Sequence, residues 1–258
     1  MKRRSFLELV GLGAAGVCAV PVARALGSAS RTEPAPEALP GKRWAMVVDE
    51  RKCLTRDGCK ACTEACHRGH NVPAMKDPRH EVKWIWKEQL ADVFPERVTP
   101  YTPAAVKALP TMVLCNHCDN PPCVRVCPTQ ATWKRADGIV MMDEHRCIGC
   151  RYCITACPYG ARSFNFEDPR PSIPGELADY PTRTRGVVEK CTFCTERLAV
   201  GKRPLCVEAC EGIGCGALVF GDASDPGSPV SALLRSTDVT RRKPELGTSP
   251  HVFYVLRG

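Results

Sequence analysis

The sequence is poor in aromatic residues and, beyond its N-terminal segment, in long hydrophobic runs. Only 6% of the 258 residues are aromatic, whereas 23 are proline and 20 are glycine. No later segment reaches the 18 apolar residues of a membrane-spanning helix. No run of Lys or Arg marks a nucleic-acid surface, although the formal net charge is +8. We therefore expect a loop-rich mature chain without a membrane span or a nucleic-acid partner, held together by disulfides or metal.

The sequence also lacks the signs of a catalytic centre and of covalent haem. No nucleophile, base or substrate pocket can be argued, so we expect a non-catalytic protein. The haem attachment motif C-x-x-C-H is absent; the segment Cys62–His67 imitates it with one residue too many, and His67 is interpreted as a helix-end residue. His117 and His145 lie beside cysteines and are expected to hydrogen-bond to sulfur or backbone.

Cysteine, by contrast, is abundant, with 18 residues, of which 16 fall into four groups of four. The third group, residues 147–158, reads C-I-G-C-R-Y-C-I-T-A-C-P, which is the bacterial ferredoxin spacing. Three thiolates on a tight turn can hold three corners of an iron–sulfur cube. The fourth lies on a short helix and reaches the other cluster of a pair. The groups are Cys53, Cys59, Cys62, Cys66; Cys115, Cys118, Cys123, Cys127; Cys147, Cys150, Cys153, Cys157; and Cys191, Cys194, Cys206, Cys210.

The other three groups vary this unit. The first widens its opening loop to five residues, the second widens its central loop, and the fourth inserts eleven residues before its third cysteine. All four end in C-x3-C. After the fourth group the usual proline is missing and residues 211–215 displace the exit segment, so Cys215 is an alternative to Cys210 as a ligand. We favour Cys210 because it keeps the C-x3-C spacing. Cys18 stands apart from every group.

Two other uses of cysteine have to be weighed. A disulfide scaffold usually joins distant loops, whereas these thiols crowd within single turns. A zinc-stabilised interaction protein would use C-x2-C pairs. Zinc sites normally take two such pairs, which leaves the repeated third cysteine and the C-P unexplained. Iron–sulfur ligation is therefore favoured, with zinc as the alternative from another class.

Residues 1–27 are interpreted as a twin-arginine-type signal peptide. Arg3 and Arg4 precede an apolar run of about 15 residues that ends in the small-residue pattern of Ala23 and Ala25. An ordinary secretory signal and a retained anchor are the alternatives. Because this route exports folded proteins, clusters assembled in the cytoplasm can reach the periplasm intact. We expect a periplasmic protein that associates with the inner membrane through its partners.

Short strands and short helices are expected around the cysteine turns, so the predicted class is α+β with little regular structure. Asp137-Gly138 between two apolar runs predicts a hairpin. Strands are expected over residues 44–48, 111–114, 131–134, 139–142, 161–166, 186–189 and 251–256. Helices are expected over residues 60–66, 151–156, 195–200, 204–209 and 230–235.

From residue 42 to about 221 the chain resembles the iron–sulfur subunits of the dimethyl-sulfoxide-reductase and polysulfide-reductase type. The order of the four groups and the run C-N-H-C-D-N-P-P-C at residues 115–123 carry the resemblance. It implies two interleaved ferredoxin-like units. The first comprises residues 42–110, with an insertion at 67–110, and residues 186–221; the second comprises residues 111–166. A linker at 28–41, a proline-rich loop at 167–185 and a C-terminal extension at 222–258 complete the chain.

The resemblance also implies four [4Fe–4S] clusters, each with four cysteine ligands. Its ligand sets are Cys53, Cys59, Cys62 and Cys210; Cys66, Cys191, Cys194 and Cys206; Cys115, Cys118, Cys123 and Cys157; and Cys127, Cys147, Cys150 and Cys153.

Within this family, residues 57–73 and 81–85 look most like the periplasmic subunit of the Dsr membrane complex. That likeness implies electron transfer in sulfur metabolism, between a polytopic quinone-reactive membrane subunit and a multihaem cytochrome c. The alternative is the electron-transfer subunit of a molybdopterin reductase of the tetrathionate or polysulfide type.

Overall fold

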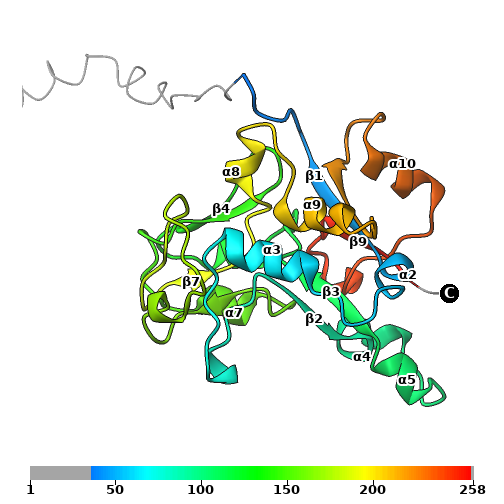
Figure 1. The fold of residues 1–258 in the computed structure, drawn as a ribbon, viewed down its shortest axis with the longest axis horizontal. Helices are drawn as coiled ribbons and strands as arrows, with labels where there is room; N and C mark the ends of the chain where they lie inside the picture. The colour runs from blue at the N-terminus through cyan, green and yellow to red at the C-terminus, as the bar shows by residue number, and fades with distance from the viewer. Residues whose placement is uncertain (1–35, 257–258) are drawn as a thin grey trace, which may run out of the picture. The chain divides into compact units, whose positions relative to one another are not determined.

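The structure is a computed structural model that describes residues 36–256 (Figure 1). The predicted signal peptide, Cys18 and residues 28–35 of the predicted linker lie outside the described residues. Of the described residues, 37–256 belong to one compact unit. In the part of the chain that is described, no helix is long and apolar enough to cross a membrane.

A three-stranded sheet joins the start of the described chain to its end. Its order is β8-β1-β9, with β1 antiparallel to β8 and parallel to β9. Strand β1 (Trp44–Asp49) is buried throughout because both of its faces are covered, one by the main core and the other by a smaller core around Val230 of the C-terminal extension. Strand β8 (Leu218–Asp222) follows the fourth cysteine group, and β9 (Val252–Val255) lies near the C-terminus. The C-terminal extension is therefore part of the fold's largest sheet.

Three two-stranded antiparallel sheets lie around the cysteine turns. They are β2 (Ile85–Gln89) with β3 (Pro110–Leu114), β4 (Thr132–Lys134) with β5 (Val140–Met142), and β6 (Ser163–Phe164) with β7 (Val188–Glu189). The β4–β5 pair is the predicted hairpin, and Gly138 in its turn has a φ of +87°. In each sheet at least one strand directly precedes or follows a cysteine group. The β4–β5 pair is a hairpin, whereas in the other two sheets the partner strand comes from a distant segment of the chain.

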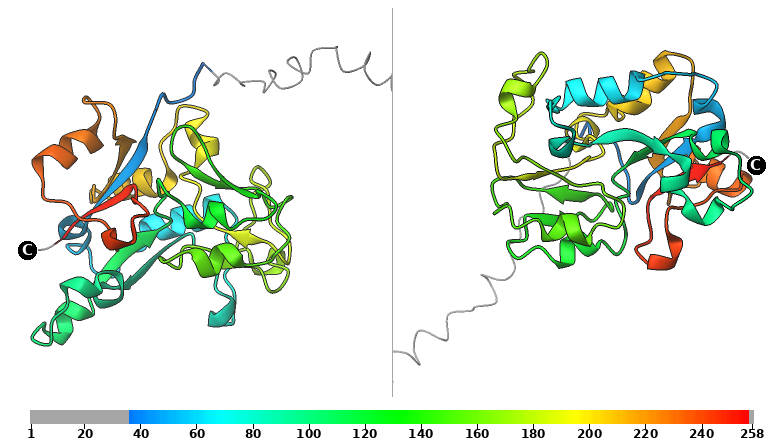
Figure 2. Two further views of the ribbon diagram at one scale, coloured as in Figure 1. Left: turned by 180° about the vertical axis from the view of Figure 1, so that it is seen from behind. Right: turned by 90° about the horizontal axis from the view of Figure 1, so that it is seen from below.

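The helices are short, and two of them dominate. Helix α3 (Ala61–Gly69) and helix α9 (Leu205–Gly212) pack side by side, and the two views of the ribbon agree on this (Figures 1 and 2). Helix α6 (Pro122–Arg125) packs against α7 (Tyr152–Ala156) in the same way. The others are α2 (Glu50–Cys53), α4 (Leu90–Val93), α5 (Ala104–Lys107), α8 (Thr195–Leu198) and α10 (Pro229–Ser236), with 3₁₀ turns at Pro78–His80, Pro95–Arg97, Arg170–Ser172 and Pro244–Leu246.

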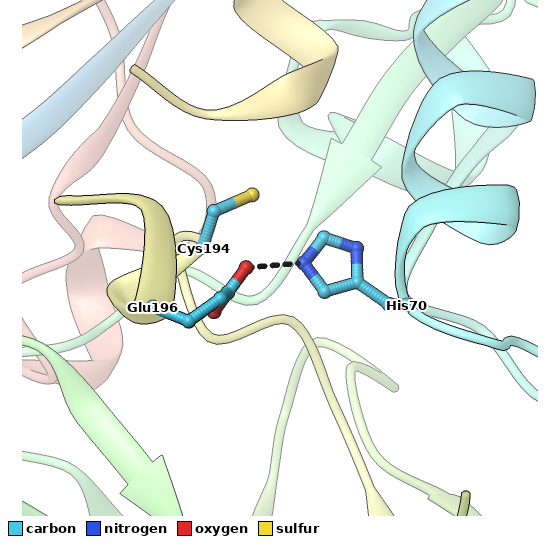
Figure 3. A group of neighbouring side chains, drawn as sticks. All are labelled: His70, Cys194 and Glu196. Carbon is cyan, nitrogen blue, oxygen red and sulfur yellow. Dashed lines mark hydrogen bonds and ion pairs between the residues drawn. The ribbon is translucent and has the colours of Figure 1, made fainter. Parts of the chain in front are cut away.

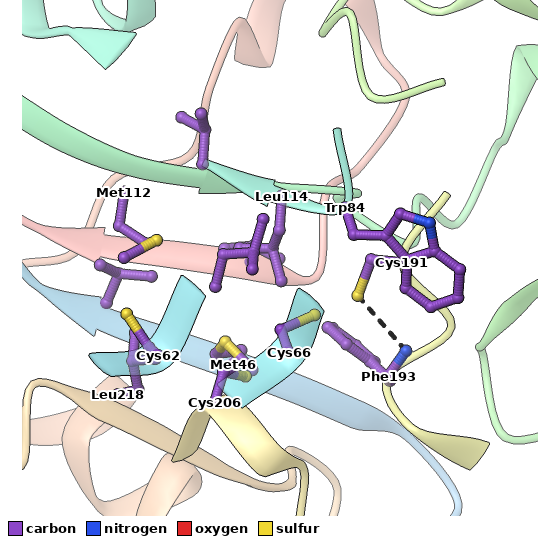
Figure 4. Close-up of a cluster of buried hydrophobic side chains, with 14 of the residues drawn as sticks. Met46, Cys62, Cys66, Trp84, Met112, Leu114, Cys191, Phe193, Cys206 and Leu218 are labelled. Atoms are coloured by element: carbon purple, nitrogen blue, oxygen red, sulfur yellow. Dashed lines mark hydrogen bonds between the residues drawn. The ribbon is translucent and has the colours of Figure 1, made fainter. Parts of the chain in front are cut away.

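The main core lies between α3, α9 and the strands, and thiols are part of it. Figure 4 shows Cys62, Cys66 and Cys206 on the two helices among Met46, Met112 and other apolar side chains. Trp84 and Trp86 are buried, at 2% and 8% exposure. Both belong to the main core.

The described elements are compatible with the predicted α+β class, whereas the interleaved units and their boundaries stay predictions. All seven predicted strands and five predicted helices occur, mostly with shorter or shifted ends. Strand β2 was not predicted, because the insertion at residues 67–110 is rich in proline. It forms because β3, more than twenty residues later, pairs with it. Strand β8 was likewise missed, since its pairing with β1 joins distant segments.

Candidate metal centres

Seventeen cysteines line four separate cavities, four to each with Cys215 as a fifth in the first. The first cavity is lined by Cys53, Cys59, Cys62 and Cys210, and the second by Cys66, Cys191, Cys194 and Cys206. The third is lined by Cys115, Cys118, Cys123 and Cys157, and the fourth by Cys127, Cys147, Cys150 and Cys153. The structure thus brings together the same four sets that the family resemblance implied. None of the seventeen cysteines in residues 36–256 is in a disulfide, which removes the support for a disulfide scaffold.

Two helices connect the first cavity to the second. Helix α3 carries Cys62 into the first and Cys66 into the second, while α9 carries Cys206 into the second and Cys210 into the first. Residues four apart on a helix share a face and are separated by about 6 Å along its axis. The repeated C-x3-C spacing therefore fixes the separation of the two cavities, which we call the first pair.

The third and fourth cavities are connected in the same way and form the second pair. Cys123 lies on α6 and faces the third cavity, and Cys127, just beyond that helix, faces the fourth. Cys153 lies on α7 and faces the fourth cavity, and Cys157 at its end faces the third. The crossing of two C-x3-C segments is thus common to both pairs.

The turns that carry three thiols each contain a residue with left-handed backbone. These residues are Gly58, His117, Gly149 and Phe193, with φ values between +41° and +69°. At Gly149 an added Cβ would come 2.4 Å from the carbonyl oxygen of Gly186, so glycine is required there. Non-glycine residues in this region cost about 1–3 kcal/mol each. The fold accepts this cost because the turn must curl its thiols towards one point.

Several of the thiols are held in surroundings that disfavour a bare thiolate, whereas hydrogen bonds from Thr132 and Thr129 lower the pKa of Cys127. Burial raises the pKa of Cys62 to about 11, that of Cys53 to about 12 and that of Cys66 well above its ordinary value. Four soft thiol donors converging on one point suit iron or zinc, which displaces the protons when it binds. Disulfide exchange, which needs an accessible thiolate, is disfavoured at these buried positions.

Shared helices join the first cavity to the second and the third to the fourth, and the ring of His117, in the turn of the third cavity, stacks on Phe193 in the wall of the second. These contacts place the four cavities in a row, and the charges of the thiols agree with that order. After burial, the largest cause of the raised pKa of Cys191, in the second cavity, is Cys115 of the third. Cys62 of the first cavity contributes to the raised pKa of Cys66 in the second. Cys123 of the third contributes likewise to that of Cys153 in the fourth. The order is first, second, third, fourth.

Buried donors without partners show that the walls suit a sulfur-rich occupant. The Nδ2 atom of Asn116 and the Nη2 atom of Arg162 lie in the wall of the third cavity, and the hydroxyl of Thr192 in that of the second. Within residues 36–256 these buried atoms have no hydrogen-bond partner. Buried polar groups are normally satisfied. Sulfide and thiolate sulfur atoms would accept hydrogen bonds from them, so the walls fit an iron–sulfur cluster.

His70, which the sequence analysis did not single out, supports the second cavity. It lies near Cys194 and Glu196 (Figure 3). Its Nε2 is 3.0 Å from Glu196 Oε1, and its Nδ1 is 2.8 Å from the carbonyl oxygen of Cys66. Both ring nitrogens are thus engaged, so His70 acts as a wall residue rather than a metal ligand. His67 and His70 follow Cys66 by one and four residues, and this spacing was the sequence signal that could have indicated the role of His70.

Comparison with known proteins identifies the family. The model of the 4Fe-4S dicluster domain matches residues 105–223. The chain is 44% identical to the Hdr-like menaquinol oxidoreductase iron-sulfur subunit 1 of Archaeoglobus fulgidus, over 100% of this chain and 99% of that protein. It is 39% identical to a tetrathionate reductase subunit of Salmonella typhimurium, over 98% and 87%. It is 35% identical to a polysulfide reductase component of Wolinella succinogenes, over 83% and 94%.

The chain is a member of the family of iron–sulfur subunits of the polysulfide-reductase and dimethyl-sulfoxide-reductase type. The predicted cofactors, four [4Fe–4S] clusters, are confirmed. Zinc is then no longer needed to explain the thiols. The resemblance to the subunit of the Dsr complex is not confirmed. The relatives fit the alternative prediction, an electron-transfer subunit of a molybdopterin reductase, as well or better.

The remaining predicted residues lie as follows. Cys215 also lines the first cavity, beside Cys210, and is partly exposed. His117 is buried, and its Nδ1 accepts a hydrogen bond of 3.1 Å from the backbone N–H of Val140, as the sequence analysis expected of a histidine beside a ligand. His145 is exposed at the surface. His117 thus contributes to the wall between the second and third cavities, where its ring stacks on that of Phe193 with 3.8 Å between the ring centres.

Proposed function

We propose that this chain is the electron-transfer subunit of a multisubunit reductase, in which it relays electrons between a quinone-reactive membrane subunit and a catalytic molybdopterin subunit. The observation that carries the proposal is the row of four cavities, each lined by four thiols. A [4Fe–4S] cluster supplies one-electron transfer without making or breaking bonds in a substrate. A chain that holds four of them in a row needs no catalytic residue of its own.

We assign the ligands according to the cavities. The sets are Cys53, Cys59, Cys62 and Cys210; Cys66, Cys191, Cys194 and Cys206; Cys115, Cys118, Cys123 and Cys157; and Cys127, Cys147, Cys150 and Cys153. Cys210 is preferred to Cys215 because it is buried and its Sγ accepts a hydrogen bond of 3.3 Å from the backbone N–H of Ala217. The thiol of Cys215 instead lies 3.6 Å from the carbonyl oxygen of Lys52.

The protein's own part is to fix spacing and to exclude water. The C-x3-C helices α3 and α9 set the separation within the first pair, and the packed core around them leaves the second cavity without an exposed thiol. Low polarity around a redox centre strengthens each nearby charge and prevents side reactions with solvent.

The two ends of the row reach the surface and are the proposed contact points for partners. Cys53 and Cys59 of the first cavity are partly exposed. Around the fourth cavity Cys150 is exposed, and Ile148 and Tyr152 are 66% and 64% exposed. Electrons would enter at one end and leave at the other. The proposed location is the periplasmic side of the inner membrane, in accordance with the predicted twin-arginine signal.

A second candidate is a role beside a multihaem cytochrome c in a Dsr-type complex. It rests on the likeness of residues 57–73 and 81–85 to the periplasmic subunit of that complex, and the relative from a menaquinol oxidoreductase agrees with its quinone-reactive partner alone. In that case the quinone-reactive partner is the same and the redox partner at the other end differs.

Anaerobic purification of the chain from its native membranes tests the proposal. We expect about sixteen iron atoms and about sixteen labile sulfides per chain, with the spectra of four [4Fe–4S] clusters. Molybdenum in the co-purified complex supports the first candidate, and a haem-staining band without molybdenum supports the second. Colourless protein, or protein holding about four zinc ions, would refute both.

A further inference from the structure

Arg162 is a buried cation beside the second pair. It lies between the end of the third cysteine group and strand β6, and its side chain is buried, with the residue 4% exposed. Its Nη1 donates a hydrogen bond of 3.0 Å to the hydroxyl of Thr132 and lies 3.6 Å from the sulfur of Met142. These contacts hold the guanidinium group in one place, so its charge is fixed relative to the cavities.

This charge has no carboxylate partner in the described part of the chain. None of the ion pairs between residues 36 and 256 includes Arg162, and its Nη2 has no hydrogen-bond partner there. Arg183, which is equally buried, is paired with Glu189 at 2.7 Å. Burying an unpaired charge costs several kcal/mol, so a negative group must compensate Arg162.

The negative groups available to Arg162 are thiolates of two different cavities. Arg162 and Cys123 both line the third cavity. Thr132 and Met142, which the Nη1 atom of Arg162 contacts, line the fourth cavity. The guanidinium group of arginine keeps its proton in proteins. The side chain therefore stays charged between the two cavities of the second pair.

We propose that Arg162 raises the reduction potentials of the two clusters in the second pair by holding a positive charge between them. This inference rests on the proposed ligand sets. Reduction adds one negative charge to a cluster, and a nearby buried cation stabilises the reduced form more than the oxidised form. Arg162 is thus a tuning residue, because it acts on the clusters through charge and does not ligate them.

The test compares four variants of the full chain, purified anaerobically with its clusters. Arg162→Gln and Arg162→Met remove the charge, and Arg162→Lys keeps it. Arg125→Gln is the matched control, since Arg125 lies on α6 beside the second pair but lines neither of its cavities and is exposed to solvent, which screens its charge. Iron is counted first, and then the four potentials are measured by redox titration followed by electron paramagnetic resonance.

We expect two of the four clusters to become harder to reduce in both neutral variants. Their equilibrium should move at least tenfold towards the oxidised form, which is about 59 mV for a one-electron couple. In Arg162→Lys and in Arg125→Gln the equilibrium between oxidised and reduced clusters should stay within threefold of that of the wild type. Arg162→Met is included because an apolar side chain of similar length can replace a buried cation without unfolding.

The outcomes separate this inference from the proposed function. Wild-type protein with fewer than four clusters contradicts the ligand sets themselves. Full iron content with unchanged potentials in the neutral variants overturns the role of Arg162. A shift in Arg162→Lys as large as that in Arg162→Gln also overturns it, because charge would not be the cause. Equal shifts in all four clusters would show a general disturbance instead of a local field, which overturns it as well.

Discussion

The first pair and the second pair use the same crossing of two C-x3-C segments, yet they are supported differently. In the first pair the helices α3 and α9 have nine and eight residues and belong to the main core. In the second pair α6 and α7 have four and five residues, and a smaller separate core surrounds them. The main core thus encloses the first pair and reaches the second pair only on the side of Cys118 in the third cavity. The rest of the second pair depends more on its own metal bonds, its buried arginine and the C-terminal segment.

The cover of the two pairs differs too. The proline-rich loop at 167–185 closes over the end of α3, where Asn71 donates to the carbonyl oxygens of Leu177 and Tyr180 at 2.9 and 2.6 Å. The second pair is instead tied to residues 248–251, since Asp119 and Asn120 donate backbone hydrogen bonds to Ser249 and Thr248. Loss of the loop at 167–185 should thus destabilise the first pair before the second. Loss of the contacts with residues 248–251 should destabilise the second pair before the first.

The largest difference is expected when one ligand is removed from each pair. Cys206→Ala should give at least a tenfold lower yield of folded protein, because it opens the fully buried second cavity inside the main core. A structural metal site contributes on the order of 10 kcal/mol, which is as large as the stability of a whole domain. Cys150→Ala, at the exposed edge of the fourth cavity, should give folded protein that has lost at most roughly a quarter of its iron.

Yield and iron per chain measure this contrast, and the two variants control each other because the side-chain change is the same. Equal yields, or a greater loss from Cys150→Ala, would contradict the assignment of the main core to the first pair.

The next effect concerns the loop that covers the first pair. Arg183 donates to the carbonyl oxygen of His70 at 2.6 Å and pairs with the fully buried Glu189. Arg183→Gln leaves that carboxylate without its charge partner and should lower the free energy of unfolding by roughly 3–5 kcal/mol. Anaerobic chemical denaturation of the holoprotein measures it.

Arg170→Gln is the control for this substitution. Arg170 lies in the same loop and pairs with Asp168 at the surface, where no measurable loss of stability is expected. If both variants unfold at the same denaturant concentration, the buried pair does not hold the cover.

A smaller, pH-dependent effect is expected on the side of the second pair. His251 donates its backbone N–H to the carbonyl oxygen of Asn116 at 2.8 Å, and its ring Nε2 accepts from Arg43 Nε at 2.9 Å. Burial, followed by the charges of Arg43, Lys134 and Arg241, lowers the pKa of His251 to about 4. The ordinary value is about 6.5, so the unfolded chain takes up a proton between about pH 6.5 and pH 4 while the folded chain does not.

The stability from neutral His251 is complete above about pH 6.5 and is lost as the pH falls towards 4. Asp119, whose Oδ2 lies 3.2 Å from the ring, reduces the effect. We expect a loss on the order of 2 kcal/mol over this range in the wild type, and a smaller one in His251→Gln. Denaturation midpoints of both proteins at about pH 6.5, 5.5 and 4.5 measure the difference. Parallel pH profiles would show that His251 does not titrate in this way.

The comparison of the pairs also shows which features the sequence could predict. The C-x3-C repeats and turn residues act locally, so the three-thiol turns, the 137–138 hairpin and helices α3, α7 and α9 could be placed from the sequence. The pairing of groups came from the family resemblance, because spacing alone does not say which turn faces which helix. Strands β2 and β8 and the burial of Arg162 depend on contacts between distant segments, which no local pattern reveals.

The sequence also left open the choice between Cys210 and Cys215 as a ligand, and the structure places both in the wall of the first cavity. Helix α9 ends at Gly212, and the backbone N–H groups of Cys215 and Gly216 return to the carbonyl oxygen of Cys210 at 3.1 and 3.3 Å. This return brings the second thiol close to the first, although Cys210 is buried and Cys215 only partly so.

The smallest expected effect in the molecule is therefore that of Cys215→Ser, which should keep all of the iron and the wild-type denaturation midpoint. Cys210→Ser should lose iron from the first cavity, roughly one atom if a three-iron cluster remains and up to about four if the cluster is lost. Iron per chain and the electron paramagnetic resonance signal of a three-iron cluster measure the result. Loss of iron from Cys215→Ser with full iron in Cys210→Ser would reverse the assignment. The crossing of two C-x3-C segments would then occur only in the second pair.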